Sequence, residues 1–137
     1  MILGVHISGV DKLADALTEV GRLGCNTMQV FARNPQRWRD DYLDSRDIKE
    51  FRERRDKSEI SPVFIHISYL INLASPNKRL YHASIDAYVE DILEADLLGV
   101  DYIVTHMGSH KDTTEEAGIK RLTEALNAII DKTKTLS

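Results

Sequence analysis

Apolar residues along the chain follow two alternating periods. Short continuous apolar runs, each about the length of a buried strand and rich in Val, Ile, Phe or Tyr, occur at Ile2–Ile7, Thr27–Phe31, Val63–Ile67 and Tyr102–Thr105. Between them, apolar residues recur at the spacing i, i+3, i+4, i+7, which is typical of one face of a helix. The order of the two patterns therefore predicts strands that alternate with helices.

Three of the helical stretches have a clear apolar stripe. The stripes consist of Leu13, Ala16, Leu17 and Val20, of Ile85, Tyr88, Val89 and Ile92, and of Ile119, Leu122, Leu126 and Ile129. A further helix is expected around Asp47–Lys57, where charged residues predominate. Gly24 and Gly99 each follow a helical stretch and precede a strand, as glycines at the ends of helices do.

Residue types typical of helix starts precede two of the stripes. Pro76 after Ser75 fits the first helical position behind an N-cap, and Thr113 with Glu116 has the spacing of a capping box. The predicted order is β-α-β-α-β-α-β-α, which implies right-handed crossovers and a parallel sheet. Four βα units are too few for a closed (β/α)8 TIM barrel, which needs about 250 residues. The pattern predicts an α/β fold and leaves open whether it is a small open sheet or a half-barrel.

Length and charge narrow the class of protein. The 137 residues are expected to form a single domain, 1–137, and the net charge of −4 argues against a protein that coats DNA non-specifically. This charge is still compatible with a nuclease that has a local basic rim. No apolar run approaches the roughly 20 residues that span a bilayer, and the N-terminus does not resemble a signal peptide. With Cys25 as the single cysteine, a cytoplasmic protein without membrane contact is expected.

Three of the five histidines occupy equivalent positions. His6, His66 and His106 each lie near the end of an apolar run, and in α/β folds the carboxyl ends of the strands carry the active site. A single histidine at such a place is more often a hydrogen-bonded core or rim residue than a metal ligand. Three at the same level favour a shared metal, and imidazole is the commonest protein ligand for zinc.

The loops that follow the strands have unusual compositions. The segment Ala32–Arg39 contains three arginines, two side-chain amides and the only tryptophan; its polar residues are expected to contact phosphate and bases, and Trp38 is expected to pack on the protein. The apolar segment Ser68–Leu73 either packs or inserts between bases. In Gly108–Lys111, a Gly-Ser turn is expected to leave backbone N–H groups free for a phosphate.

These segments resemble a known family. The string His66–Pro76 is similar to the signature of the endonuclease IV (deoxyribonuclease IV) family of abasic-site endonucleases. His106–His110 resembles the family's His-Pro-Gly-Ser-His signature, with Met107 in place of proline. Gly4–Ser8 and Phe31–Trp38 also resemble family segments, so the resemblance covers the whole chain.

The resemblance implies a (β/α)8 barrel with three zinc ions at the strand ends, which hydrolyses the phosphodiester 5′ of an abasic site in double-stranded DNA during base excision repair. It implies that His66 and His106 bind one zinc ion, so that this chain supplies at most part of one metal site. Tyr69 and Leu70 would enter the duplex at the lesion. Gln36 lies where the family presents another intruding side chain.

Other residues of the same loops are expected to contact DNA. They are Asn34, Arg37, Gly108, Ser109 and His110. The resemblance implies that His6 lies beside the metal site without being a ligand.

Two features depart from the family pattern. Gly9 and Val10 follow Ser8 where family members have a longer Gly-Gly-containing loop, and the sequence stops before the fifth strand, which carries a bridging glutamate in the family. The chain is therefore expected to be the N-terminal half of such an enzyme, inactive by itself and prone to self-association. A sugar isomerase or epimerase of a related metal-dependent barrel and a non-catalytic half-barrel fragment stay open. The Tyr-Leu pair beside an Arg/Asn/Gln loop favours DNA over a sugar.

Overall fold

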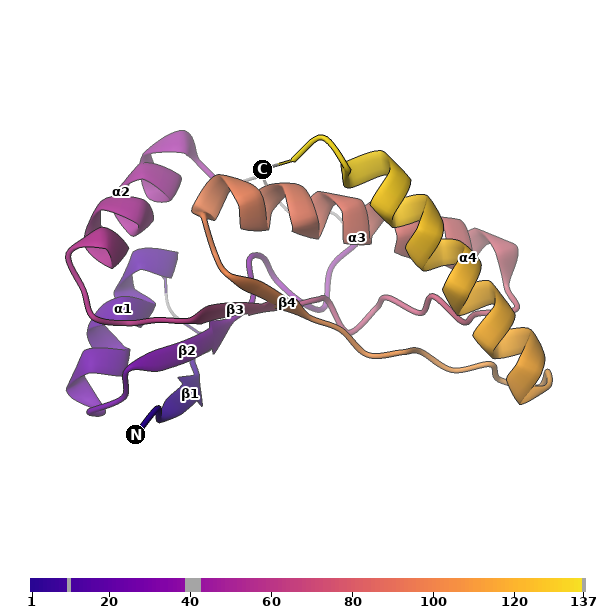
Figure 1. Ribbon diagram of the computed structural model, residues 1–137, viewed down its shortest axis with the longest axis horizontal. Helices are drawn as coiled ribbons and strands as arrows, with labels where there is room; N and C mark the ends of the chain where they lie inside the picture. Colours follow the sequence, from indigo (N-terminus) through magenta and orange to yellow (C-terminus); the bar gives the residue numbers. More distant parts are fainter. Residues whose placement is uncertain (10, 39–42, 137) are drawn as a thin grey trace.

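A computed structural model describes residues 1–9, 11–38 and 43–136 and confirms the predicted alternation of strands and helices (Figure 1). The elements are β1 (Gly4–His6), α1 (Leu13–Arg22), β2 (Thr27–Val30), α2 (Ser45–Asp56), β3 (Val63–His66), α3 (Lys78–Leu98), β4 (Tyr102–Val104) and α4 (Glu115–Thr133). The strands are parallel and lie in the order β1-β2-β3-β4. Arg39 of the polar loop and Val10 lie outside the described residues.

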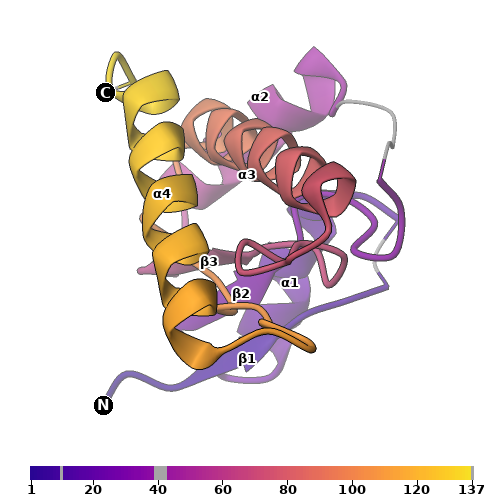
Figure 2. The ribbon, with the colours of Figure 1, turned by 90° about the vertical axis from the view of Figure 1, so that its right-hand side faces the viewer.

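The helices pack against one face of the sheet, and each contacts the next one along the chain (Figures 1 and 2). Met28 and Val63, which are in register on β2 and β3, are fully buried beneath α1 and α2. The next row of the register crosses Gln29, Phe64 and Tyr102 and lies on the opposite face, because side chains alternate along a strand. Tyr102 is 58% exposed, so this second face of the sheet is open.

Two apolar clusters form the core. The first joins the sheet to α1, α2 and the C-terminal part of α3, and it includes the fully buried Phe51. The second lies beyond the ends of β3 and β4, between the loop after β3 and helices α3 and α4, and it includes Ile71, Leu73 and Ile129. Because Ile71 and Leu73 belong to the second cluster, part of the apolar loop expected after β3 has a packing role.

The helix ends differ slightly from the predicted ones. The N-cap of α3 is Asn77, whose side chain accepts from Leu80 N, so Pro76 lies before the helix and not at its first position. The N-cap of α4 is Thr114, which accepts from Ala117 N at 3.2 Å, and not Thr113. Gly99 adopts the expected left-handed conformation at the end of α3.

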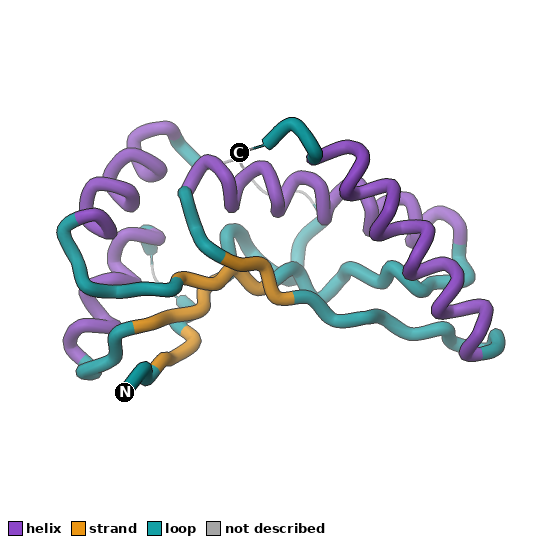
Figure 3. Tube along the Cα trace, in the orientation of Figure 1, coloured by secondary structure: helices purple, strands orange, loops and turns teal. Residues whose placement is uncertain are grey.

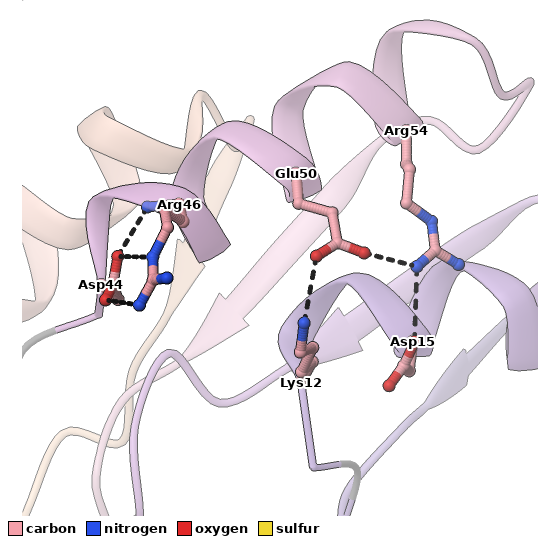
Figure 4. Close-up of polar contacts among 6 residues, drawn as sticks. All are labelled: Lys12, Asp15, Asp44, Arg46, Glu50 and Arg54. Atoms are coloured by element: carbon pink, nitrogen blue, oxygen red, sulfur yellow. Dashed lines mark hydrogen bonds and ion pairs between the residues drawn. The ribbon is translucent and has the colours of Figure 1, made fainter.

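Ion pairs on the solvent side join α1 to α2 (Figure 4). Glu50 on α2 lies 3.4 Å from Lys12 Nζ, which directly precedes α1, and 3.3 Å from the Arg54 guanidinium. Arg54 also reaches Asp15 of α1 at 3.3 Å. At the start of α2, the exposed Asp44 accepts from the backbone and side chain of Arg46, and these bonds lower the pKa of Asp44 to about 2. The ion pairs to Lys12 and Asp15 orient α2 against α1, and Phe51 is the one fully buried residue of α2.

Long loops follow β3 and β4 and extend past the strand ends (Figure 3). They are the segments that the sequence assigns to the candidate site, and they lie at the carboxyl ends of the strands. None of the helices within the described residues is both long and apolar enough to cross a membrane.

Candidate metal site and DNA interface

His66 and His106 converge at the carboxyl edge of the sheet. His66 is the last residue of β3 and is 9% exposed, whereas His106 lies two residues after β4. Their Nε2 atoms are 3.1 Å apart. His66 Nδ1 donates to the carbonyl oxygen of Ile67 at 2.7 Å, so the hydrogen of a neutral His66 lies on Nδ1 and its Nε2 lone pair faces His106.

The separation of these nitrogen atoms fits a shared zinc ion. Two nitrogens bound to one tetrahedral zinc at about 2.0–2.1 Å each lie roughly 3.3 Å apart, close to the 3.1 Å between His66 and His106. The bond from His66 Nδ1 to a backbone carbonyl is the type of outer contact that fixes a ligating imidazole. Within residues 1–9, 11–38 and 43–136, no three His, Cys, Asp or Glu side chains form a complete metal-binding group. The pair therefore fits as part of a site.

His6 lies beside this pair and is engaged by other residues. Its Nδ1 accepts from Gln29 Nε2 at 2.8 Å, and its ring packs on Phe31 with centroids 4.7 Å apart. The rings of His6 and His66 are 6.2 Å apart. Partial burial and the proximity of His66 lower the pKa of His6. The structure thus brings His6 to the edge of the site, with one ring nitrogen already bonded.

Tyr69 lies next to the histidines and is exposed. Its ring is 5.9 Å from that of His66 and 5.2 Å from that of Phe31, and 59% of the residue is accessible. Tyr69 lines two clefts: one of about 700 Å³ that also includes Gln36, and one of about 370 Å³ that also includes His106. Leu70 is half-buried. The loop after β3 therefore has two roles. The Tyr69 ring is available to a ligand, whereas Ile71 and Leu73 pack in the core.

The loop after β2 presents Gln36 and Arg37 on the surface. Asn34 shapes this loop, because its side-chain oxygen accepts from Gln36 N at 3.0 Å and its carbonyl accepts from Arg37 N at 3.3 Å. Gln36, Arg37 and Asn34 are all exposed. Trp38 is 39% exposed and lines a separate groove beside α3, so the packing expected for it is only partial.

Arg33 is engaged inside the protein, contrary to the expectation that all polar residues of this loop contact DNA. Its side chain is only 7% exposed. The guanidinium contacts the carboxylates of Asp91 and Glu90 and donates to the carbonyl oxygen of Ala87, each at 2.7–2.9 Å. All three partners belong to α3, so Arg33 is directed inward and is not available to DNA.

The loop after β4 is held by Asn72. The side-chain oxygen of Asn72 accepts from Ser109 N at 2.9 Å and from Ala74 N at 3.1 Å, and its Nδ2 donates to Ser109 O at 3.0 Å. Lys111 N donates to the Ser109 hydroxyl at 3.2 Å. Two amides of the Gly-Ser turn are thus already bonded, which corrects the expectation that they are free for a phosphate. Gly108, Ser109 and His110 are exposed.

The sequence pattern alone does not identify Asn72 or Asp91 as residues that organise the site. Asn72 lies inside the apolar string between Ile71 and Leu73, where a polar side chain needs a partner when it is enclosed. Asp91 lies next to the apolar stripe of α3 and is 2% exposed. A carboxylate beside such a stripe is the only signal in the sequence. His110, in contrast, packs against Gly118 of α4 and has no contact with the pair His66–His106 among the described interactions.

Gly108 offers a direct test of the arrangement around Asn72. Gly108 has φ +88°, and a Cβ there would lie 2.3 Å from Asn72 Oδ1, which already accepts two hydrogen bonds. Gly108→Ala is therefore expected to lower the free energy of unfolding by more than the roughly 1–2 kcal/mol of a left-handed alanine. Gly24→Ala is the matched control, because Gly24 has φ +70° with nothing within 4 Å. Equal losses in urea unfolding of the two variants would contradict the role of Asn72.

The parallel sheet and its covering helices, with histidines at its carboxyl edge, have the arrangement of one half of a (β/α)8 barrel. The chain belongs to the Xylose isomerase-like TIM barrel family, whose family model matches residues 17–136. This confirms the predicted fold class.

Comparisons with individual proteins confirm the resemblance to endonuclease IV. The chain is 33% identical over 134 residues to a protein of Halothermothrix orenii named "Probable endonuclease 4", covering 98% of this chain and 48% of that protein. It superposes on endonuclease IV from Thermus thermophilus with a TM-score of 0.80 and 32% identity, over 93% of this chain and 45% of the other. The chain thus spans about half the length of the relatives it matches. D-psicose 3-epimerase from Clostridium cellulolyticum has a TM-score of 0.74 at 16% identity, over 98% of this chain and 49% of the other, which shows a shared fold alone.

Proposed function

We propose that this chain carries part of the active site of a zinc-dependent endonuclease that hydrolyses the phosphodiester 5′ of abasic sites in DNA. The observation that carries the proposal is the convergence of His66 and His106, with Nε2 atoms 3.1 Å apart, beside the exposed ring of Tyr69. The endonuclease IV relatives at about one-third identity support it. A cytoplasmic location is part of the same proposal.

His66 and His106 would hold the metal through Nε2. The bond from His66 Nδ1 to Ile67 O keeps one ring orientation and directs the other nitrogen toward the ion. A bound zinc lowers the pKa of a water molecule and stabilises charge on a phosphate. Of the three zinc ions implied by the family, the described residues would supply ligands for part of one site.

The surrounding loops would recognise the damaged duplex. Tyr69 and Leu70 would fill the space at the lesion, where a missing base leaves a gap in the stack. Asn34 and Gln36 line the 700 Å³ cleft together with Tyr69, and Arg37 follows Gln36 in the same exposed loop. The loop that contains Gly108, Ser109 and His110 borders the second cleft and would contact the backbone of the DNA.

Binding of two candidate substrates separates this function from that of the epimerases with the same fold. The product of the native reading frame should bind a duplex with one abasic site at least about tenfold more tightly than the intact duplex, and it should not epimerise a ketohexose in the presence of zinc or manganese. Fluorescence anisotropy measures the binding of DNA, and chromatography of the sugars measures epimerisation. Turnover of the sugar with no preference for the lesion would reject the proposal.

The 137-residue chain, when produced by itself, is expected to bind zinc weakly, to associate with itself and to show negligible cleavage of abasic DNA. Catalytic zinc sites usually have three protein ligands, whereas the described residues bring two together. Strands β1 and β4 are open edges, and Tyr102 is exposed on the uncovered face. Zinc titration, light scattering and a cleavage assay test this expectation. A monodisperse monomer that binds zinc tightly and cuts abasic DNA would contradict it.

A further inference from the structure

A buried ion pair connects the loop after β2 to helix α3, outside the metal site. The Arg33 guanidinium lies 2.7 Å from Asp91 Oδ1 through one terminal nitrogen and 2.9 Å through Nε. The exposed fractions of the two side chains are 7% and 3%. Glu90 and the carbonyl oxygen of Ala87 accept from the terminal nitrogens, each at 2.8 Å. The base of the loop 33–38 is thus fixed to α3 by four contacts of one side chain.

The loop that follows β3 is held by α3 and by the loop after β2. Asn72 N at its end donates to the Ser84 hydroxyl of α3 at 2.9 Å. The Ser68 hydroxyl donates to Pro35 O at 2.8 Å, and Tyr69 N donates to the same carbonyl at 3.2 Å. The contacts form a closed circuit from Arg33 through Asp91 and α3 to the loop 68–72, and back to Pro35, which is two residues beyond Arg33 in the chain. Neither loop can shift alone without breaking a bond of this circuit.

Burial of the charged groups of Arg33 and Asp91 lowers the stability of the fold. Burial raises the pKa of Asp91 although Arg33 opposes this effect. Asp91 Oδ2 has no hydrogen-bond partner within the described part of the chain. Apolar residues of similar volume often give a fold that is as stable as one with a buried ion pair, or more so, whereas charged groups fix one arrangement of the parts they join. The pair is therefore better explained by the placement of the loops than by stability.

We propose that Arg33 and Asp91 are positioning residues that hold the loops 33–38 and 68–72 in one mutual arrangement, so that Gln36 and Tyr69 are presented together. The identity of the ligand, a duplex with an abasic site, rests on the proposed function. The coupling of the loops is a property of the chain and can be measured without DNA.

Hydrogen exchange of the Tyr69 amide measures the circuit directly, because this amide donates to Pro35 O within it. The test variant is Arg33→Met with Asp91→Leu, which removes both charges of the pair. We expect the Tyr69 amide to exchange at least about tenfold faster, with zinc content unchanged and unfolding by urea little altered. Arg33→Lys keeps the charge but cannot reach Asp91 through two nitrogens, and it should restore part of the protection.

A matched double variant controls for the loss of an ion pair as such. Arg54→Met with Asp15→Leu removes the pair that joins α2 to α1 in Figure 4, and it should leave the Tyr69 amide protected. Wild-type exchange in the Arg33/Asp91 double variant would overturn the inference and leave the proposed function intact. Faster exchange together with about tenfold weaker binding of abasic DNA supports both proposals. Faster exchange in a protein whose wild type has no preference for abasic DNA would reject the proposed function and keep the coupling.

Discussion

Replacing His66 or His106 by alanine in the product of the native reading frame is expected to remove bound zinc and cleavage of abasic DNA together. Each variant loses one of two nitrogens that converge within 3.1 Å, and the remaining imidazole is a poor site by itself. We expect the rate of cleavage to fall at least about 100-fold, because changes to outer contacts of a zinc ligand already cost roughly 10–100-fold. Atomic absorption of the purified variants and a cleavage assay give the two readouts.

His82→Ala is the control for this experiment. His82 is exposed on α3, where its ring contacts Tyr81 at a centroid distance of 5.3 Å and no element of the metal site. The variant should keep its zinc and its activity. Full zinc content and full cleavage in both the His66 and the His106 variant would show that the two histidines are not ligands.

The double variant Tyr69→Ala with Leu70→Ala is expected to weaken binding of abasic DNA about 10- to 100-fold, which corresponds to the roughly 1–3 kcal/mol of one stacked aromatic contact. Tyr69 is 59% exposed at the site, and Leu70 directly follows it. Neither side chain is a zinc ligand, so the zinc content should not change. Fluorescence anisotropy with abasic and intact duplexes measures the effect.

Two exposed leucines on α3 provide the matched control. Leu93 and Leu97 are 41% and 52% exposed, away from the carboxyl edge of the sheet, and their double replacement by alanine should leave DNA binding unchanged. A loss of zinc in the Tyr69/Leu70 variant that parallels the loss of DNA binding would instead assign this loop to core packing.

The sequence is sufficient to predict the elements, because burial on one face imposes a period on each of them. Every expected strand and helix is present, including α2, which has few apolar residues and is oriented by Phe51 and by ion pairs to α1. The sequence pattern predicts the starts of α3 and α4 one or two residues too early. A cap depends on which side chain reaches the backbone N–H three residues later, and adjacent residues such as Thr113 and Thr114 have equal chemistry.

Composition does not reveal the direction of a polar side chain in a loop. Arg33 and Arg37 belong to the same arginine-rich segment, yet Arg33 is enclosed by α3 and Arg37 is exposed. The difference depends on Asp91, a residue 58 positions away from Arg33 in the chain. In the same way, Asn72 bonds to Ser109 across two loops. Such long-range pairings come from tertiary packing and have no local period.

Cleavage of a duplex with one abasic site at a known position is the sharpest test of the proposed function. The protein produced from the native reading frame is incubated with a duplex labelled at the 5′ end of the damaged strand, before and after removal of metal by a chelator. We expect one labelled fragment that ends at the nucleotide 5′ of the lesion, no cut in the intact duplex, loss of cleavage on chelation and recovery with zinc. An uncut duplex, a cut on the 3′ side of the lesion, or cleavage that survives removal of the metal would contradict it.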